Sequence, residues 1–198
     1  DNSREVNLYC RNKKCFKEIQ DNRTNSRYLP NIIFPENINI FSNIEDSIRN
    51  ANTLIIALPS ETIRDTFLQL KNIINSKTGI SWASKGLEVK SGLLIHSVCE
   101  EVLGKRHPMA VISGPSFAVE VANKKPTAVT IASSSRSFRN QIARDLSSQN
   151  FRVYTSDDVI GSEIGGAIKN IIAIGAGISD GLNYGENAKI ALITRGLH

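Results

Sequence analysis

The segment GSEIGGAIKNIIAIGAGISDG, residues 161–181, decides how the rest of the chain is interpreted. Placed on a helix, its isoleucines gather on one side, and glycine, alanine and serine gather on another side around Lys169. Each glycine costs a helix about 1 kcal/mol relative to alanine, so two adjacent glycines indicate close packing or a binding surface. We therefore expect a small-residue floor of a site, with Lys169 projecting from it beside Asn170, and an apolar core face. That core face consists of Ile164, Ile168, Ile171, Ile172 and Gly175.

Lys169 has two interpretations. A lysine in a helix is usually just solvated. Lys169, however, lies in a run with almost no other charge between Glu163 and Asp180. Partial desolvation would disfavour the ammonium form and lower the pKa of Lys169 towards neutrality, where an amine can exchange protons.

Composition narrows the class of protein. The 198 residues are 40% hydrophobic and 22% charged, as in a soluble globular protein with one domain and part of a second. Polar residues interrupt every apolar stretch, so we expect no membrane span. The net charge of +5 is scattered, which suits an anionic small ligand and does not indicate nucleic acid. Cys10, Cys15 and Cys99 match no zinc or disulfide framework, which predicts reduced thiols in the cytoplasm.

Strand and helix patterns alternate along the chain. Strands are expected at residues 5–10, 38–42, 53–59, 79–84, 109–113, 127–133 and 151–156. Helices are expected at residues 11–20, 44–51, 91–103, 137–147 and 157–198, and after Ser60 and Gly114, whereas residues 21–36 should form a loop. The alternation predicts an α/β fold, a Rossmann-like doubly wound, mostly parallel sheet followed by the start of an all-helical C-terminal domain. Residues 1–156 and 157–198 would be these two parts, with a hinge near residues 155–159.

Ligands of such sheets bind beyond the carboxyl ends of the strands, where Arg11, Ser60, Lys85 and Gly114 are expected. No G-x-G-x-x-G precedes residues 5–10, so we expect a first strand and glycine loop upstream of Asp1. The stretch IIAIGAGISDG partly matches this glycine motif, but Asp180 stands where the third glycine should be. The helical spacing of its apolar residues is the stronger signal, so we interpret the stretch as helix. Arg11 would then stand where an acidic residue grips the ribose of NAD, and its cation would accept the 2′-phosphate of NADPH. A surface arginine in a polar turn is the alternative.

Two further turns could contact an anion. Gly114-Pro115-Ser116 is expected to open a helix, whose free amides and Ser116 hydroxyl would form an anion site, although ordinary capping is more frequent. Lys85-Gly86 is a turn that could contact a phosphate or carbonyl. The histidines at positions 96, 107 and 198 lack metal-ligand or triad spacing, so we expect them to be structural or surface residues, with no metal site.

Several longer motifs together resemble one family, the bacterial-type NAD(P)-dependent glycerol-3-phosphate dehydrogenases. The resemblance covers essentially the whole chain, in the family's order, and is highly specific. Its motifs are WASKGLE (82–88), SGPSFAVEV (113–121), PTAVTIAS (126–133), RVYTSDDVIG (152–161), GGAIKN (165–170), DGL (180–182) and ALITRGL (191–197), and RYLP (27–30) also fits.

The resemblance implies reversible reduction of dihydroxyacetone phosphate to sn-glycerol 3-phosphate with NADP or NAD, feeding glycerophospholipid synthesis. Lys169 resembles the general acid/base, and Lys85 resembles a lysine that contacts both cofactor and substrate. The remaining substrate contacts would be Gly114, Ser116 and Asn170, and the remaining cofactor contacts would be Arg11 and Ala118.

The same resemblance implies a longer enzyme. The family's glycine loop and a later helical part that holds the substrate phosphate are absent, so the chain alone is expected to be inactive. The full-length enzyme could be a homodimer. Another dehydrogenase of the β-hydroxyacid or 6-phosphogluconate type and a non-catalytic nucleotide-sensing protein remain alternatives; a nucleic-acid module is the least favoured.

Overall fold

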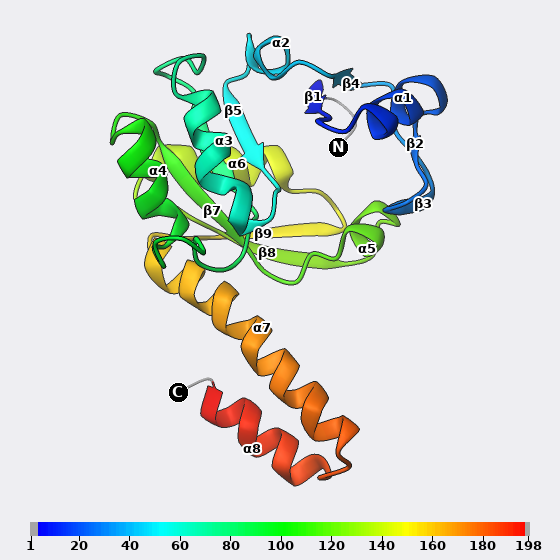
Figure 1. Cartoon of the computed structure of the whole chain (residues 1–198), viewed down its shortest axis with the longest axis vertical. Helices are drawn as coiled ribbons and strands as arrows, with labels where there is room; N and C mark the ends of the chain where they lie inside the picture. The colour runs from blue at the N-terminus through cyan, green and yellow to red at the C-terminus, as the bar shows by residue number, and fades with distance from the viewer. Residues whose placement is uncertain (1–3, 197–198) are drawn as a thin grey trace.

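A computed structural model describes residues 4–196, and its centre is a five-stranded sheet (Figure 1). The strand order is β5-β6-β7-β8-β9, and every neighbouring pair is parallel except β7 and β8, which are antiparallel. The expected doubly wound, mostly parallel sheet is therefore confirmed, with one antiparallel pair in it. Its strands are β5 (Thr53–Ile56), β6 (Gly79–Trp82), β7 (Met109–Ser113), β8 (Thr127–Ala132) and β9 (Phe151–Ser156).

Helices cover both faces of this sheet and build two apolar cores. On one face, α3 (Ile63–Leu70) and α4 (Ile95–Leu103) pack around Phe67 and Trp82, which are fully buried. On the other face, α6 (Arg136–Leu146) buries Phe138 and Ile142 against β7 and β8. Strand β6 is buried at all four positions because both of its faces are covered, and its one polar side chain, Ser81, donates to the Leu54 carbonyl at 2.9 Å.

Residues 4–50 form a separate unit beside the five-stranded sheet (Figure 1). Strands β1 and β4 pair in parallel, and β2 and β3 form a short antiparallel pair. The second pair lies within residues 21–36, so the expected loop is wrong there; Pro30 and the polar residues of this stretch concealed an edge strand. The elements are β1 (Val6–Tyr9), α1 (Lys13–Asn22), β2 (Thr24–Asn25), β3 (Leu29–Ile33), β4 (Ile38–Phe41) and α2 (Ile44–Ile48).

Helix α7 (Val159–Gly181) leaves the sheet and projects from it, and α8 (Glu186–Gly196) returns alongside (Figure 1). A turn at residues 182–185 separates them, so the tail is two helices rather than one continuous helical run. The expected core face is wrong: Ile164, Ile168 and Ile171 are 40%, 39% and 69% exposed, because only α8 covers the outer part of α7. Gly175 does contact α8, through Leu192.

Length and hydropathy alone would allow α7 to cross a membrane, contrary to the expectation that polar residues interrupt every apolar stretch. Its first turns instead pack on β7, and Glu163 is buried there with hydrogen-bond partners from the sheet layer. These contacts join the first turns of α7 to the sheet through Glu163 and Gly166, its buried residues there.

Three helix starts differ from the sequence expectation. Ser60 begins a 3₁₀ turn (η1, Ser60–Thr62) and its side chain caps nothing. Helix α4 begins at Ile95 rather than Ser91, because residues 85–94 form an irregular loop. Helix α5 (Ala118–Ala122) begins three residues after Pro115 and is only five residues long, so Pro115 is not its first residue.

Gly79 and Gly177 offer a matched test of packing. A Cβ at Gly79 would lie 2.1 Å from Cε2 of the buried Phe138, so Gly79→Ala should lower the free energy of unfolding by about 1–3 kcal/mol. A Cβ at Gly177 in α7 would meet nothing within 4 Å, so Gly177→Ala should leave stability unchanged or raise it by about 1 kcal/mol. Urea unfolding followed by circular dichroism measures both, and equal midpoints would contradict the packing at Gly79.

Candidate active site

Most of the candidate residues lie at one end of the central sheet, where β5, β6 and β7 have their carboxyl ends. Ser60, Lys85 and Gly114 follow the carboxyl ends of β5, β6 and β7, as expected. Because β8 runs antiparallel to β7, the amino ends of β8 and β9 lie at this same edge. Helix α7 starts from the carboxyl end of β9, at the opposite edge, and crosses β7 to reach the candidates.

Gly114 makes a turn that no other residue could make without strain. Its φ of +138° lies in the range that favours glycine, and an added Cβ would lie 2.9 Å from the Ala128 carbonyl oxygen. The chain can therefore leave β7 tightly against β8. Ser116 is half-buried just beyond, and its hydroxyl donates to the Gly114 carbonyl at 3.5 Å.

Lys85 belongs to a loop that is held in place by the hydrogen bonds of Glu88. The buried carboxylate of Glu88 accepts from Arg64 Nε at 3.1 Å and from the Ser91 amide at 3.0 Å. These hydrogen bonds, from Arg64 first, lower the pKa of Glu88 and keep it charged. Lys85 itself is half-buried, and its Nζ donates to the Ala83 carbonyl at 3.3 Å.

Helix α7 passes close to this loop at Gly166. A Cβ there would lie 3.4 Å from Ser113 Oγ and 3.8 Å from Lys85 Cγ, which are ordinary contact distances. The neighbouring Gly165 faces open space, so packing requires glycine at neither position. The small-residue floor lies against Lys85 at Gly166.

Lys169 lies one turn beyond Gly166 and is exposed. Its Nζ stands 5.7 Å from the centre of the Phe117 ring, a distance at which a cation and an aromatic face attract. The desolvation expected for Lys169 is therefore not observed. The pKa of Lys85 is lowered, by its burial first and by the nearby Lys169 charge second. The two ammonium groups are close enough to repel.

Glu163 fixes α7 to the sheet and was not anticipated from the sequence. Its Oε1 accepts from the Trp82 indole at 3.0 Å and from the His96 amide at 3.0 Å. Its Oε2 lies 2.5 Å from His96 Nδ1, and Ser97 Oγ lies 3.1 Å from the other ring nitrogen. The signal available in the sequence was a lone carboxylate three residues before Gly166 in an otherwise apolar helix.

The other three candidates, Arg11, Asn170 and Ala118, are exposed. Arg11 is exposed after β1, in the two-stranded sheet, and no hydrogen bond within residues 4–196 joins its side chain to Lys85 or Lys169. Asn170 is exposed, and no described hydrogen bond holds its amide. Ala118 begins α5 and is exposed. His107 is buried with Nδ1 3.1 Å from the Thr78 carbonyl, a structural role as expected, and His198 lies outside the described residues.

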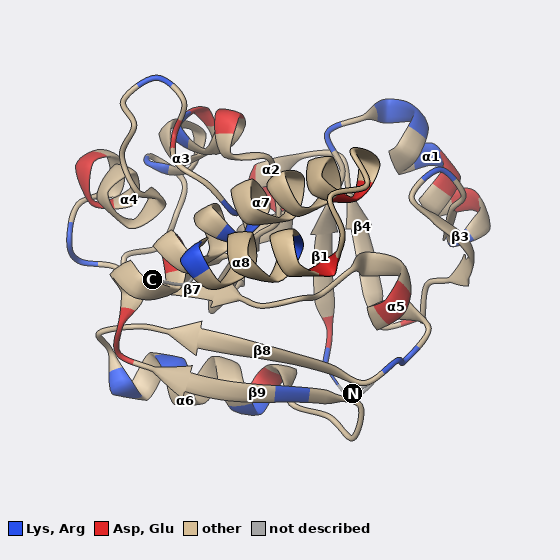
Figure 2. Cartoon of the chain, turned by 90° about the horizontal axis from the view of Figure 1, so that it is seen from below, with Lys and Arg blue, Asp and Glu red and all other residues tan. Residues whose placement is uncertain are grey.

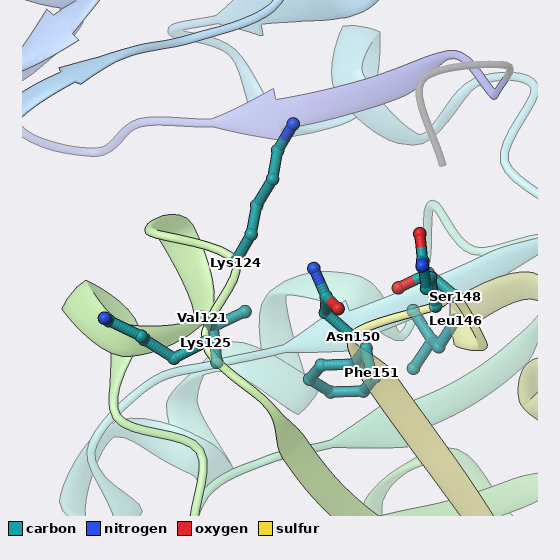
Figure 3. A pocket seen from close by; sticks show the side chains of 8 residues that line it. Val121, Lys124, Lys125, Leu146, Ser148, Asn150 and Phe151 are labelled. Carbon is teal, nitrogen blue, oxygen red and sulfur yellow. The ribbon is translucent and has the colours of Figure 1, made fainter.

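A hollow at the amino end of β9 contains none of the candidates (Figure 3). Lys124 and Lys125 extend from its rim in different directions, so their charges do not converge on one point.

Seen from below, α7 and α8 lie on the other side of β8 from α6 (Figure 2). The chemistry expected from the sequence therefore centres on the Lys85–Lys169 pair.

Comparison with known proteins agrees with the resemblance seen in the motifs. A family model described as NAD-dependent glycerol-3-phosphate dehydrogenase N-terminus matches residues 1–139, and the corresponding C-terminus model matches residues 158–198. The chain belongs to the NAD-dependent glycerol-3-phosphate dehydrogenase family.

Relatives of this dehydrogenase family match almost the whole chain. The glycerol-3-phosphate dehydrogenase [NAD(P)+] of Bartonella tribocorum is 43% identical over 197 residues, which are 99% of this chain and 59% of the relative. The crystal structure of glycerol-3-phosphate dehydrogenase from Coxiella burnetii superposes with a TM-score of 0.92 at 44% identity, covering 98% of this chain and 59% of that one. The Saccharomyces cerevisiae enzyme superposes at 0.85 with 27% identity, over 98% and 59% of the two chains. The chain thus spans about three fifths of the length of these dehydrogenases.

The Glu163 contacts predict a large loss of stability on truncation. Glu163→Ala would leave the buried Trp82 indole and the His96 amide without their acceptor, which should cost about 2–4 kcal/mol of unfolding free energy. Glu163→Gln keeps an acceptor oxygen and should cost less. Trp82 is the only tryptophan, so urea unfolding followed by its fluorescence measures both variants. A loss for Ala no greater than for Gln would contradict the network.

The lysine pair predicts a change in titration. The pKa of Lys85 is lowered partly by the Lys169 cation, so Lys169→Met should raise the Lys85 pKa towards its ordinary value. Labelling of Lys85 by an amine reagent across a pH series, followed by peptide mass spectrometry, measures this pKa. In Lys105→Met, which removes an exposed lysine elsewhere, the Lys85 curve should stay in place. An unmoved curve in Lys169→Met would mean that the two groups do not interact.

Proposed function

We propose that the protein containing this chain catalyses the NAD(P)-dependent, reversible reduction of dihydroxyacetone phosphate to sn-glycerol 3-phosphate, a step that feeds glycerophospholipid synthesis. The observation that carries the proposal is the approach of Lys85 to α7 at Gly166, with Lys169 one turn away, at the sheet edge where such folds bind ligands. Family membership and the names of the relatives support the same reaction.

The two lysines have different tasks in this proposal. The exposed Lys169 donates a proton to the oxygen of the ketone as it becomes an alkoxide, and removes that proton in the reverse direction. Lys85, half-buried on a fixed loop, supplies a second positive charge that stabilises the developing negative charge. Asn170, Gly114 and Ser116 complete the proposed substrate contacts. The mutual repulsion of the two cations favours an anionic substrate between them.

The donor chemistry of the chain fits a dinucleotide cofactor, NADP or NAD. Arg11 presents an exposed guanidinium just after β1, which suits a 2′-phosphate, and Lys85 lies at the sheet edge. We propose Arg11, Lys85 and Ala118 as the cofactor contacts of this chain. The nicotinamide, when bound, supplies or accepts the hydride.

The remaining assignments follow from the same proposal. Residues 1–156 would form the NAD(P)-binding domain and residues 157–198 the beginning of the helical substrate domain, which agrees with the separate ranges of the two family models. We place the protein in the cytoplasm and propose a homodimer for the longer enzyme. Another β-hydroxyacid-type dehydrogenase or a non-catalytic sensor is not favoured, because both family models name glycerol-3-phosphate dehydrogenase.

Replacement of Lys169 tests the proposed reaction. In an enzyme that spans the whole length of the relatives, Lys169→Ala should lower kcat about 10²–10⁴-fold, the usual contribution of a general acid/base. Cofactor affinity, measured by NADPH fluorescence titration, should be retained. Lys105→Ala, which removes an exposed lysine paired only with Glu100, is the matched control and should keep its turnover. Near-normal turnover of Lys169→Ala would refute the assignment.

A further inference from the structure

Two cysteines meet where β1 passes into α1. The Sγ atoms of Cys10 and Cys15 are 3.6 Å apart, in contact, and both side chains are partly exposed. Their backbones are held: the Cys10 amide donates to the Phe41 carbonyl of β4 at 2.8 Å, and the Cys15 amide donates to the Asn12 side chain at 3.1 Å. A disulfide needs its sulfurs about 2.05 Å apart, so rotation of the side chains on this fixed backbone would close the gap.

The charges around the pair give the two sulfurs different roles. Cys15 lies in the first turn of α1, beside Lys13 and Lys14, and that turn contains no acidic residue. Basic residues gather at this end of the helix (Figure 2), and Cys15 is the sulfur that lies in its first turn. The acidic residue one turn further on, Glu18, is engaged by the Ser26 amide at 2.7 Å.

Cys10 is the protonated member of the pair. Burial, and then its hydrogen bond with Cys15, raise the pKa of Cys10 to about 11, so it keeps its proton at neutral pH. It can donate that proton towards Cys15. An attacking thiolate next to a protonated partner thiol is the arrangement of redox-responsive cysteines.

We propose that Cys10 and Cys15 form a reversible disulfide when the protein meets a peroxide. The Cys15 thiolate attacks one peroxide oxygen, an S–O bond forms, the O–O bond breaks, and the departing hydroxide takes up a proton as water. The Cys10 sulfur then attacks the Cys15 sulfenic acid, the S–S bond forms, and the hydroxyl leaves with the Cys10 proton as water. Two thiols lose two electrons in total, and one peroxide is reduced to two waters. A dithiol restores both thiols by exchange.

The bridge would change the segment that carries Arg11. Residues 10–15 would become a closed ring that includes Arg11 and the helix-capping Asn12. Restricting this ring would alter how Arg11 is presented. This consequence rests on the proposed function, whereas formation of the bridge does not.

Peroxide treatment followed by peptide mapping tests the bridge directly. The 198-residue chain is exposed to a small excess of hydrogen peroxide, the remaining thiols are blocked with iodoacetamide, and the digested peptides are weighed. The expected product is an intramolecular Cys10–Cys15 disulfide that a dithiol reverses, with Cys99 unoxidised. Cys99 is the internal control, because it is fully buried and its burial raises its pKa to about 12.

Two variants separate the roles of the sulfurs. Cys10→Ser should stop at the sulfenic acid on Cys15, which dimedone traps, and Cys15→Ser should lose most of the oxidation at Cys10. Circular dichroism of both variants checks that they are folded. Equal oxidation of all three cysteines, disulfides between separate molecules, or the same dimedone trapping in the unchanged chain as in Cys10→Ser would each overturn the proposal.

Discussion

The carboxylate of Glu163 is the contact on which the arrangement of the site depends. It accepts from Trp82 in the sheet and from the backbone of His96 in α4, and it belongs to α7. A buried acceptor with several donors is costly to disturb, because each donor left alone in the interior loses its partner. This contact therefore sets where α7 crosses the sheet, and with it the position of Gly166 and of Lys169 one turn later.

Ordinary structural elements position the two lysines of the site. Lys85 is held by a loop that Glu88 and Arg64 anchor, and Lys169 is carried by a helix that passes close to this loop at Gly166. Neither lysine has an opposite charge within the ion-pair distances found for the described residues. Their positive charges are thus available to an anion. Burial first, and the nearby Lys169 charge second, lower the pKa of Lys85.

The sequence predicted the sheet, the alternation of elements and the strand-end positions of Lys85 and Gly114, because apolar runs and glycine turns are local signals. It did not predict the Glu163 contacts, since Trp82 and Glu163 are 81 residues apart and only the fold joins them. The isoleucine face of α7 was expected to be buried but is largely exposed, for a related reason. The spacing of apolar residues along a helix shows that an apolar face exists, but it does not show which element covers that face. The short β2–β3 pair was missed because Pro30 and polar residues dominate its composition.

The exposed isoleucines along α7 have a consequence outside catalysis. Ile168, Ile171, Ile174 and Ile178 face water on a helix whose outer half only α8 accompanies. Contiguous apolar surface of this kind makes molecules adhere to one another at high concentration and engages the chaperones and proteases that survey a cell. The yield and lifetime of the isolated 198-residue chain would accordingly be set by this hairpin rather than by its well-filled α/β core.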